Sequence, residues 1–149
     1  MRSPPQPSCG APPPDGGSAS LTRPAVGGLG GATSRGAGQE RKNVMLRIYE
    51  EILEVIRLLR PIVEQIEKHD RDLARQMKRA EASMVLNTRE GSGSRGGTRR
   101  ERYHNALGST EETTGCVDTA LALGYVDAVS PCIVDKLDHI RAVLWKNTH

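Results

Sequence analysis

Residues 86–109 read LNTREGSGSRGGTRRERYHNALGS, with helix-forming sequence on both sides of a glycine cluster at 91–97. Glycine adopts the left-handed backbone conformation that often follows a helix, so Gly91 is expected to end the helix before it. Thr98, with Glu101 three residues later, forms a capping box typical of a helix start. The stretch therefore predicts a reversal between two helices.

The glycine cluster also spells one nucleotide-binding motif and nearly spells a second. Gly91 to Gly96 matches the pattern G-x-G-x-x-G, but that motif works after a strand, and the preceding residues have a helical pattern. Gly97 stands where a P-loop carries the lysine that contacts the β- and γ-phosphates. A hairpin loop between two helices is the favoured interpretation.

Apolar residues recur every three or four positions on both sides of this loop, which predicts four helices. Before the loop these positions are Met45, Ile48, Ile52, Val55, Leu59, Ile62 and Ile66, then Leu73, Met77, Ala80, Met84 and Asn87. After it they are Tyr103, Leu107, Thr110, Thr114, Val117, Leu121 and Gly124, then Ile133, Leu137, Ile140 and Leu144. The first helix is expected at 43–67 with a bend near 57–61, because Pro61 removes a helical hydrogen bond. Gly108 and Gly115 inside the third helix predict that another helix backbone comes close.

Capping residues predict the other helix ends. Asp70 or Asp72 is expected to start the second helix. Gly124 is expected to end the third, and the Ser-Pro pair at 130–131 to start the fourth. Short connections favour antiparallel neighbours. The expected fold is all-α, an antiparallel up-down-up-down four-helix bundle over residues 43–149.

The first 42 residues differ in composition from the rest of the chain. Residues 1–40 hold seven of the nine prolines and nine of the sixteen glycines. Such a segment buries too little apolar surface to offset its ordering entropy, so residues 1–42 are expected to form a disordered tail. Met45 lies where the helical pattern begins, and the natural start of translation is expected near it.

Composition and spacing argue against several classes of function. No apolar run approaches the ~18 residues of a membrane span. The three cysteines show no metal-ligand spacing, and their odd count without a signal peptide fits a reducing cytoplasm. No histidine or carboxylate set has the spacing of a catalytic or metal site. We expect no enzyme, metal, cofactor or small-molecule substrate.

Basic side chains gather around the glycine loop. Residues 71–102 carry nine basic and four acidic side chains on a chain whose net charge is +3. The candidate contacts to an RNA or DNA backbone are Arg75, Lys78, Arg79, Arg89, Arg95, Arg99, Arg100 and Arg102. Cations and helix N-terminal amides both bind phosphate. The alternative is a protein-interaction scaffold, in which these arginines pair with acids across subunit boundaries.

Two stretches resemble a known family, the bacterial four-helix bundle proteins, also called 23S rRNA intervening-sequence proteins. They are LARQMKRAEASMVLNTREGSGSRG at 73–96 and RRERYHNALGSTEETTGCVDTALALGYVD at 99–127. The shared positions are Gln76, Arg79, Ser83, Leu86, Asn87, Glu90, Gly91, Gly108, Ser109, Glu112, Leu123, Gly124 and Tyr125. The chain departs from the family at Val85, commonly proline, and at Thr88-Arg89, commonly Ile-Ala.

The resemblance implies a bundle that assembles as a ring, typically a homopentamer, with no catalytic activity. A similar bundle serves as the accessory protein of diversity-generating retroelements, where a basic barrel binds nucleic acid and a reverse transcriptase. By analogy, Asn87, Glu90 and Gly91 form a structural turn that fixes the end of the second helix.

Overall fold

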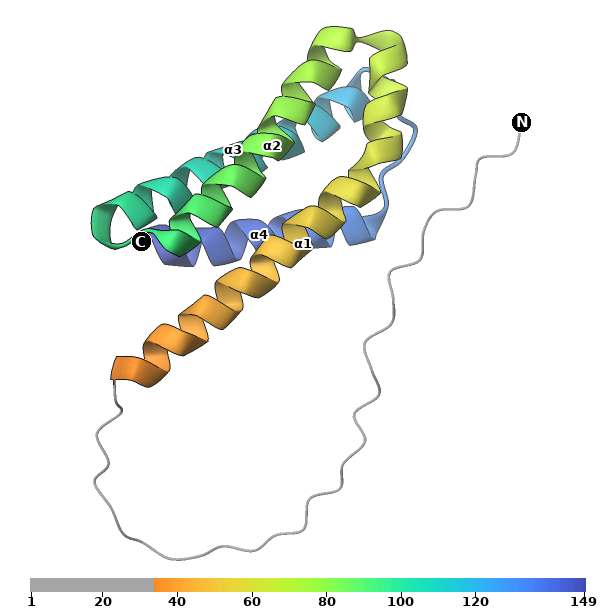
Figure 1. The fold of residues 1–149 in the computed structure, drawn as a ribbon. Coiled ribbons are helices and arrows are strands. Elements are labelled where there is room, and N and C mark those ends of the chain that lie inside the picture. Colours follow the sequence, from red (N-terminus) through yellow and green to blue (C-terminus); the bar gives the residue numbers. More distant parts are fainter. Residues whose placement is uncertain (1–33) are drawn as a thin grey trace, which may run out of the picture.

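The structure, a computed structural model, describes residues 34–149 as four helices (Figure 1). They are α1 (Ser34–His69), α2 (Arg71–Gly93), α3 (Gly96–Ala122) and α4 (Pro131–Thr148). No strand occurs within these residues, so the prediction of an all-helical chain is confirmed. Most of the predicted tail lies outside the described residues. Its last part, residues 34–42, belongs to α1, which begins nine residues before the predicted boundary.

The apolar seam of α1 forms a large part of the core. All seven predicted positions, from Met45 to Ile66, are buried. α1 continues through Pro61, and Figure 1 shows the axis of this helix turning in its yellow part. A proline inside a helix lacks the N–H that would bond the carbonyl four residues earlier, which accounts for the bend.

The four helices share one apolar core. α1 packs against α2 and α4, and α3 packs against the same two helices. The predicted stripe of α4 is buried throughout, as are Met77, Ala80 and Met84 of α2. Of the predicted α3 seam, Tyr103, Leu107, Thr110 and Val117 are buried, but Leu121 is exposed. The face of α3 that meets the core is therefore rotated slightly from the predicted one, and it includes Ala106, Thr113 and Ala120.

Three of the predicted helix ends are confirmed. Only Asp70 separates α1 from α2, and its Oδ1 accepts hydrogen bonds of 2.9 Å from the backbone N–H groups of Asp72 and Leu73. Gly124 follows α3 with a φ of 71°, in the left-handed region. Ser130 and Pro131 start α4, although the Ser130 side chain makes no capping bond.

The α2–α3 turn differs from its prediction. α2 continues through Gly91 to Gly93, and the left-handed glycine is Gly96, with a φ of 57°. α3 begins at Gly96, so Thr98 and Glu101 lie inside this helix and the predicted capping box does not form. The left-handed residue sits five positions later than predicted because Gly93 still follows helical geometry.

Gly91 is required by packing. A Cβ added at this position would lie 2.5 Å from Cε1 of Tyr103, closer than any real carbon contact. Glycine therefore lets α2 approach the tyrosine ring of α3. The opposite holds for Gly108 and Gly115, where an added Cβ would meet no atom of the described residues within 4 Å. The predicted close approach at these two glycines is wrong for this chain taken alone.

Hydroxyl side chains fill the middle of the α2–α3 interface. Thr110 and Thr113 are fully buried, and each donates a 2.9 Å hydrogen bond to the carbonyl four residues earlier in α3. The Ser109 hydroxyl donates to Ser83 Oγ of α2 at 2.8 Å. Bonds of this kind satisfy a hydroxyl locally, so α3 can bury polar side chains in an aliphatic core.

Candidate nucleic-acid interface

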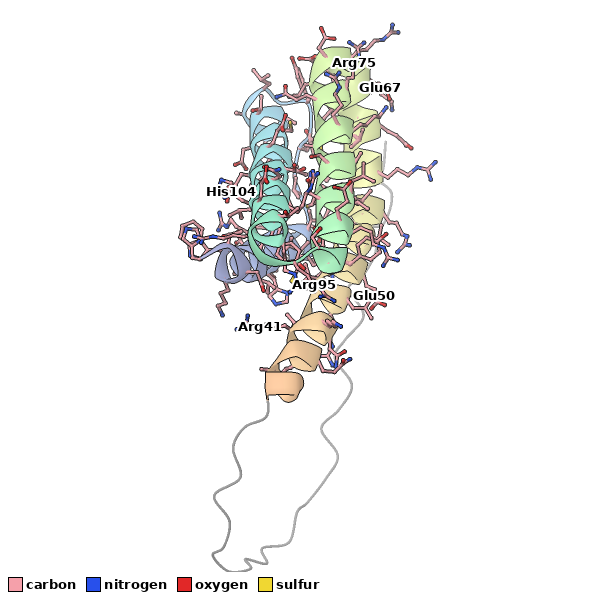
Figure 2. The ribbon with its side chains drawn as sticks, turned by 60° about the vertical axis from the view of Figure 1, so that its left-hand side comes forward. Arg41, Glu50, Glu67, Arg75, Arg95 and His104 are labelled. Carbon is pink, nitrogen blue, oxygen red and sulfur yellow. The ribbon has the colours of Figure 1, made fainter. Side chains whose placement is uncertain are left out.

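The eight predicted nucleic-acid contacts divide between the two ends of α2. Figure 2 shows Arg75 at the upper end and Arg95 at the lower end. The 19 residues between these arginines, nearly all of them in α2, span roughly 30 Å. The structure therefore does not bring the eight side chains into one patch.

Two of the three predicted contacts at the upper end, Lys78 and Arg75, are paired with carboxylates. Lys78 Nζ lies 2.9 Å from Glu67 Oε2, and Arg75 Nη1 lies 3.0 Å from Asp72 Oδ1. These pairs are exposed, and each contributes at most about 1 kcal/mol to stability. Arg79 is exposed farther along α2 and has no ion-pair partner among residues 34–149. One of the three predicted contacts at this end is therefore unpaired, and the exposed Lys68 and Arg71 nearby also have no ion-pair partner among residues 34–149.

Asn87 and Glu90 hold Arg102 at the lower end. Arg102 Nε lies 3.0 Å from Glu90 Oε2, and its Nη1 donates to Asn87 Oδ1 at 3.4 Å. The Asn87 amide also donates to the carbonyl of Ser83 at 2.9 Å. These contacts tie the end of α2 to α3. They favour a structural role for Asn87 and Glu90, and the same role for Arg102.

Arg99 and Arg100 bond the carbonyl ends of neighbouring helices. Arg99 Nε donates to the carbonyl of Ser94, just past α2, at 2.7 Å. Arg100 Nε donates to the carbonyl of Thr148, at the end of α4, at 2.6 Å. Cations stabilise these negative helix ends. Each guanidinium has five N–H donors, and only Nε is engaged by the described residues.

A pocket of about 410 Å³ lies beside these arginines, where α1 begins, α2 ends, α3 begins and α4 ends. Four basic residues line it, namely Arg41, Lys42, Arg89 and Arg99, and no acidic residue does. Arg95, the N-cap of α3, is exposed and makes no side-chain capping bond. We call Arg41, Lys42, Arg89, Arg95 and Arg99 the cationic end. None of the five has a carboxylate partner among residues 34–149.

The sequence reasoning missed Arg41 and Lys42 because it placed them in the tail. A usable signal was present, since Gly38 and Arg41 continue the spacing of three and four that begins at Met45. Figure 2 shows Arg41 on the lower part of α1, at the same end of the molecule as Arg95. Three helices therefore contribute to the cationic end, one more than the sequence predicted.

Two buried titratable groups lie between α2 and α3, away from the cationic end. Burial raises the pKa of Glu81 to about 7, an effect that Lys78 partly offsets, and Glu81 Oε1 has no hydrogen-bond partner among the described residues. Burial, with Glu112 and Glu81 nearby, raises the pKa of the Cys116 thiol, which keeps the thiol protonated and unreactive. Residues 34–149 contain no group of three histidines, cysteines or carboxylates that could hold a metal ion. No helix in this part of the chain is long and apolar enough to cross a membrane.

Comparisons of the chain with protein-family models, curated proteins and solved structures found no match. The resemblance to the 23S rRNA intervening-sequence proteins therefore stays a prediction from the residues that carry it.

Proposed function

We propose that this chain is a non-enzymatic, oligomeric helical protein that binds the RNA or DNA backbone through its cationic end. The observation that carries this proposal is the meeting of five basic residues from three helices, with no carboxylate partner among residues 34–149. Unpaired cations at a protein surface bind phosphates and release their counterions. Arg75, Lys78 and Arg102 take no part, because carboxylates already hold them.

The arrangement proposed for the helices is the antiparallel up-down-up-down bundle. Connections of one and two residues join α1 to α2 and α2 to α3, which favours reversal of direction at each turn. The packing of α1 and α3 against α2 and α4 agrees with four helices around one core. This arrangement gathers the start of α1, the turn between α2 and α3 and the end of α4 at one end.

The amides at the start of α3 add to the attraction for phosphate. The Arg95 side chain leaves the first-turn N–H groups of α3 uncapped. Such groups, with the positive end of the helix dipole, favour anions. Contacts of this kind read the backbone and not the bases, so we expect low sequence specificity and strong salt dependence.

Replacing Arg41 and Arg95 with glutamine is expected to weaken binding without changing the fold, because both side chains are exposed. Each lost phosphate contact lowers the slope of log affinity against log salt by about one, so the double variant should lose about two. Fluorescence anisotropy of a labelled oligonucleotide over a salt series measures this slope. The matched control is Arg57→Gln with Arg71→Gln, which removes the same charge from exposed sites elsewhere. Equal slopes for the two double variants would contradict the proposal.

A second candidate function is a protein-interaction scaffold that assembles as a homo-oligomer, a pentamer if the family resemblance holds. The observation that favours it is the bare face of α3 at Gly108 and Gly115, where nothing in the described chain fills the space beside either glycine. Glycine inside a helix costs about 1 kcal/mol against alanine, a cost that close contact with another subunit would explain.

For the scaffold function, Gly108→Ala with Gly115→Ala is expected to lower the mass of the assembly, because the added methyl groups would separate the two surfaces. Light scattering after size-exclusion chromatography measures this mass, and circular dichroism verifies that the helices persist. An unchanged mass, with the free energy of unfolding raised by about 1 kcal/mol per site, would show that this face is open to solvent.

A further inference from the structure

We infer that the pocket at the cationic end holds one nucleotide of a single strand, with its base against the apolar wall and its phosphate at the basic rim. This inference rests on the proposed function and narrows its substrate class from nucleic acid in general to unpaired nucleic acid. It adds a contact to the base, which the proposed backbone binding does not include.

The size of the pocket fits a single nucleotide. Its volume of about 410 Å³ falls at the lower end of the range for small-ligand sites, roughly 300–1,000 Å³. The bases of a duplex are stacked and paired, whereas unpaired bases splay out and enter protein pockets. A pocket of this volume therefore adds nothing to duplex binding and adds a site for an unpaired base.

The wall of the pocket has the chemistry that bases stack on. Met45, Leu46, Tyr49 and Tyr103 line it; Met45 and Tyr103 are buried, so Leu46 and Tyr49 present the accessible surface. The Arg89 guanidinium lies 5.6 Å from the centre of the Tyr49 ring, in a cation–π contact. Leu46 is 53% exposed, so a base placed here would cover apolar surface. Aromatic rings and guanidinium planes are the usual stacking partners of unpaired bases.

The polar groups of the pocket suit the rest of a nucleotide. Asn147, from the end of α4, uses one amide N–H on the carbonyl of Val143 at 2.8 Å. Its Oδ1 accepts no hydrogen bond from residues 34–149, and a side-chain amide oxygen pairs well with the amino groups of bases. Arg41, Lys42 and Arg99 supply the charge for the phosphate.

The positive charge of the pocket favours a nucleic-acid strand, which carries several phosphates, over a fatty acid, which carries one carboxylate. A fatty acid would satisfy the apolar wall, but its single carboxylate would leave three of the four basic residues uncompensated. A nucleotide within a strand brings its own phosphate and the phosphates on either side. These reach Arg95 and Arg89 as well, which joins the pocket to the cationic end.

The test compares the full chain's affinity for a short single-stranded oligothymidylate and for an abasic oligomer of equal length and charge. We expect the oligothymidylate to bind about tenfold more tightly, the effect of stacking one base. Equal affinities would overturn the inference and leave the proposed backbone binding in place. Failure of both oligomers to bind would overturn the inference, and failure of a duplex of equal length as well would overturn the proposed function.

Two variants identify the pocket as the source of the difference. Tyr49→Ala removes a stacking surface and should bring the two affinities together, while the affinity for the abasic oligomer stays constant. Leu46→Ala, at an exposed site that the fold tolerates, should reduce the difference in the same direction. Leu86→Ala is the matched control, since Leu86 is 60% exposed and does not line the pocket. A tenfold difference that survives Tyr49→Ala and Leu46→Ala would place the base elsewhere and overturn the inference.

Discussion

Replacing Glu81 with glutamine is expected to make the folded chain about 3 kcal/mol more stable than the wild type near pH 8, and to change its stability little near pH 4. Glu81 is 8% exposed as a residue, and its Oε1 has no hydrogen-bond partner among the described residues. Burial raises its pKa from 4.5 to about 7. Each pKa unit corresponds to about 1.4 kcal/mol, which gives the expected magnitude.

The sign follows from proton binding. Between pH 4.5 and about 7 the folded chain keeps the Glu81 proton while the unfolded chain has lost it. The contribution of Glu81 to the free energy of unfolding is therefore fully present below pH 4.5. It is lost as the pH rises through about 7, and it stays absent above that pH. Glutamine remains neutral throughout, so this fall is absent from the variant.

Urea unfolding at several pH values measures the effect. Glu50→Gln serves as the control, because Glu50 is exposed and has no ion pair among residues 34–149. The difference in free energy of unfolding between wild type and Glu81→Gln should grow with pH, while that for the control stays flat. Parallel pH profiles for the wild type and Glu81→Gln would show that the Glu81 carboxylate is solvated in the folded chain.

Truncating Tyr103 to alanine is expected to cost about 3–5 kcal/mol, the largest effect of any single change described. Tyr103 is 3% exposed, and its ring fills the space in front of Gly91. Removing the ring leaves a cavity between α2 and α3, since the helix backbones close only part of it. Chemical denaturation measures the loss. Tyr103→Leu keeps more of the volume and should lose less.

The same contact predicts a strong coupling between Tyr103 and Gly91. Alone, Gly91→Ala should cost about 1–3 kcal/mol, because its methyl group would overlap the tyrosine ring. In the Tyr103→Ala or Tyr103→Leu background the overlap is relieved, and the same change should become neutral or stabilising through its helix propensity. A double-mutant cycle measures this coupling. Additive effects would mean that the two residues do not touch.

The helices were predictable because each is encoded by local repeats. Every apolar position of the α1 seam is buried, since spacings of three and four fix one face of a helix whatever its neighbours are. Asp70 and Gly124 were predictable for a similar reason, because a side-chain cap and a left-handed residue act within a single turn. The role of Gly91 was not predictable, since it depends on a ring twelve residues away in another helix.

The candidate site was less predictable than the fold. Charge density pointed to the loop, and Arg89, Arg95 and Arg99 do lie at the cationic end. Local sequence could not show that Glu90 pairs with Arg102 or that Glu67 pairs with Lys78, because such pairs form between different helices. Arg41 was also missed, because the glycine-rich residues before it resemble a linker. In the structure α1 already begins at Ser34.

The first turns of α1 carry a consequence for recognition. Residues 36–44 are exposed, and this stretch precedes the first core residue, Met45. A short helix without packing on either side is marginally stable in water, so these turns unwind at far lower cost than the core. Arg41 and Lys42 sit on this segment, and it forms one side of the pocket. A bound anion would then stabilise the helical form of this segment. The free energy needed to order the segment would be subtracted from the free energy of binding.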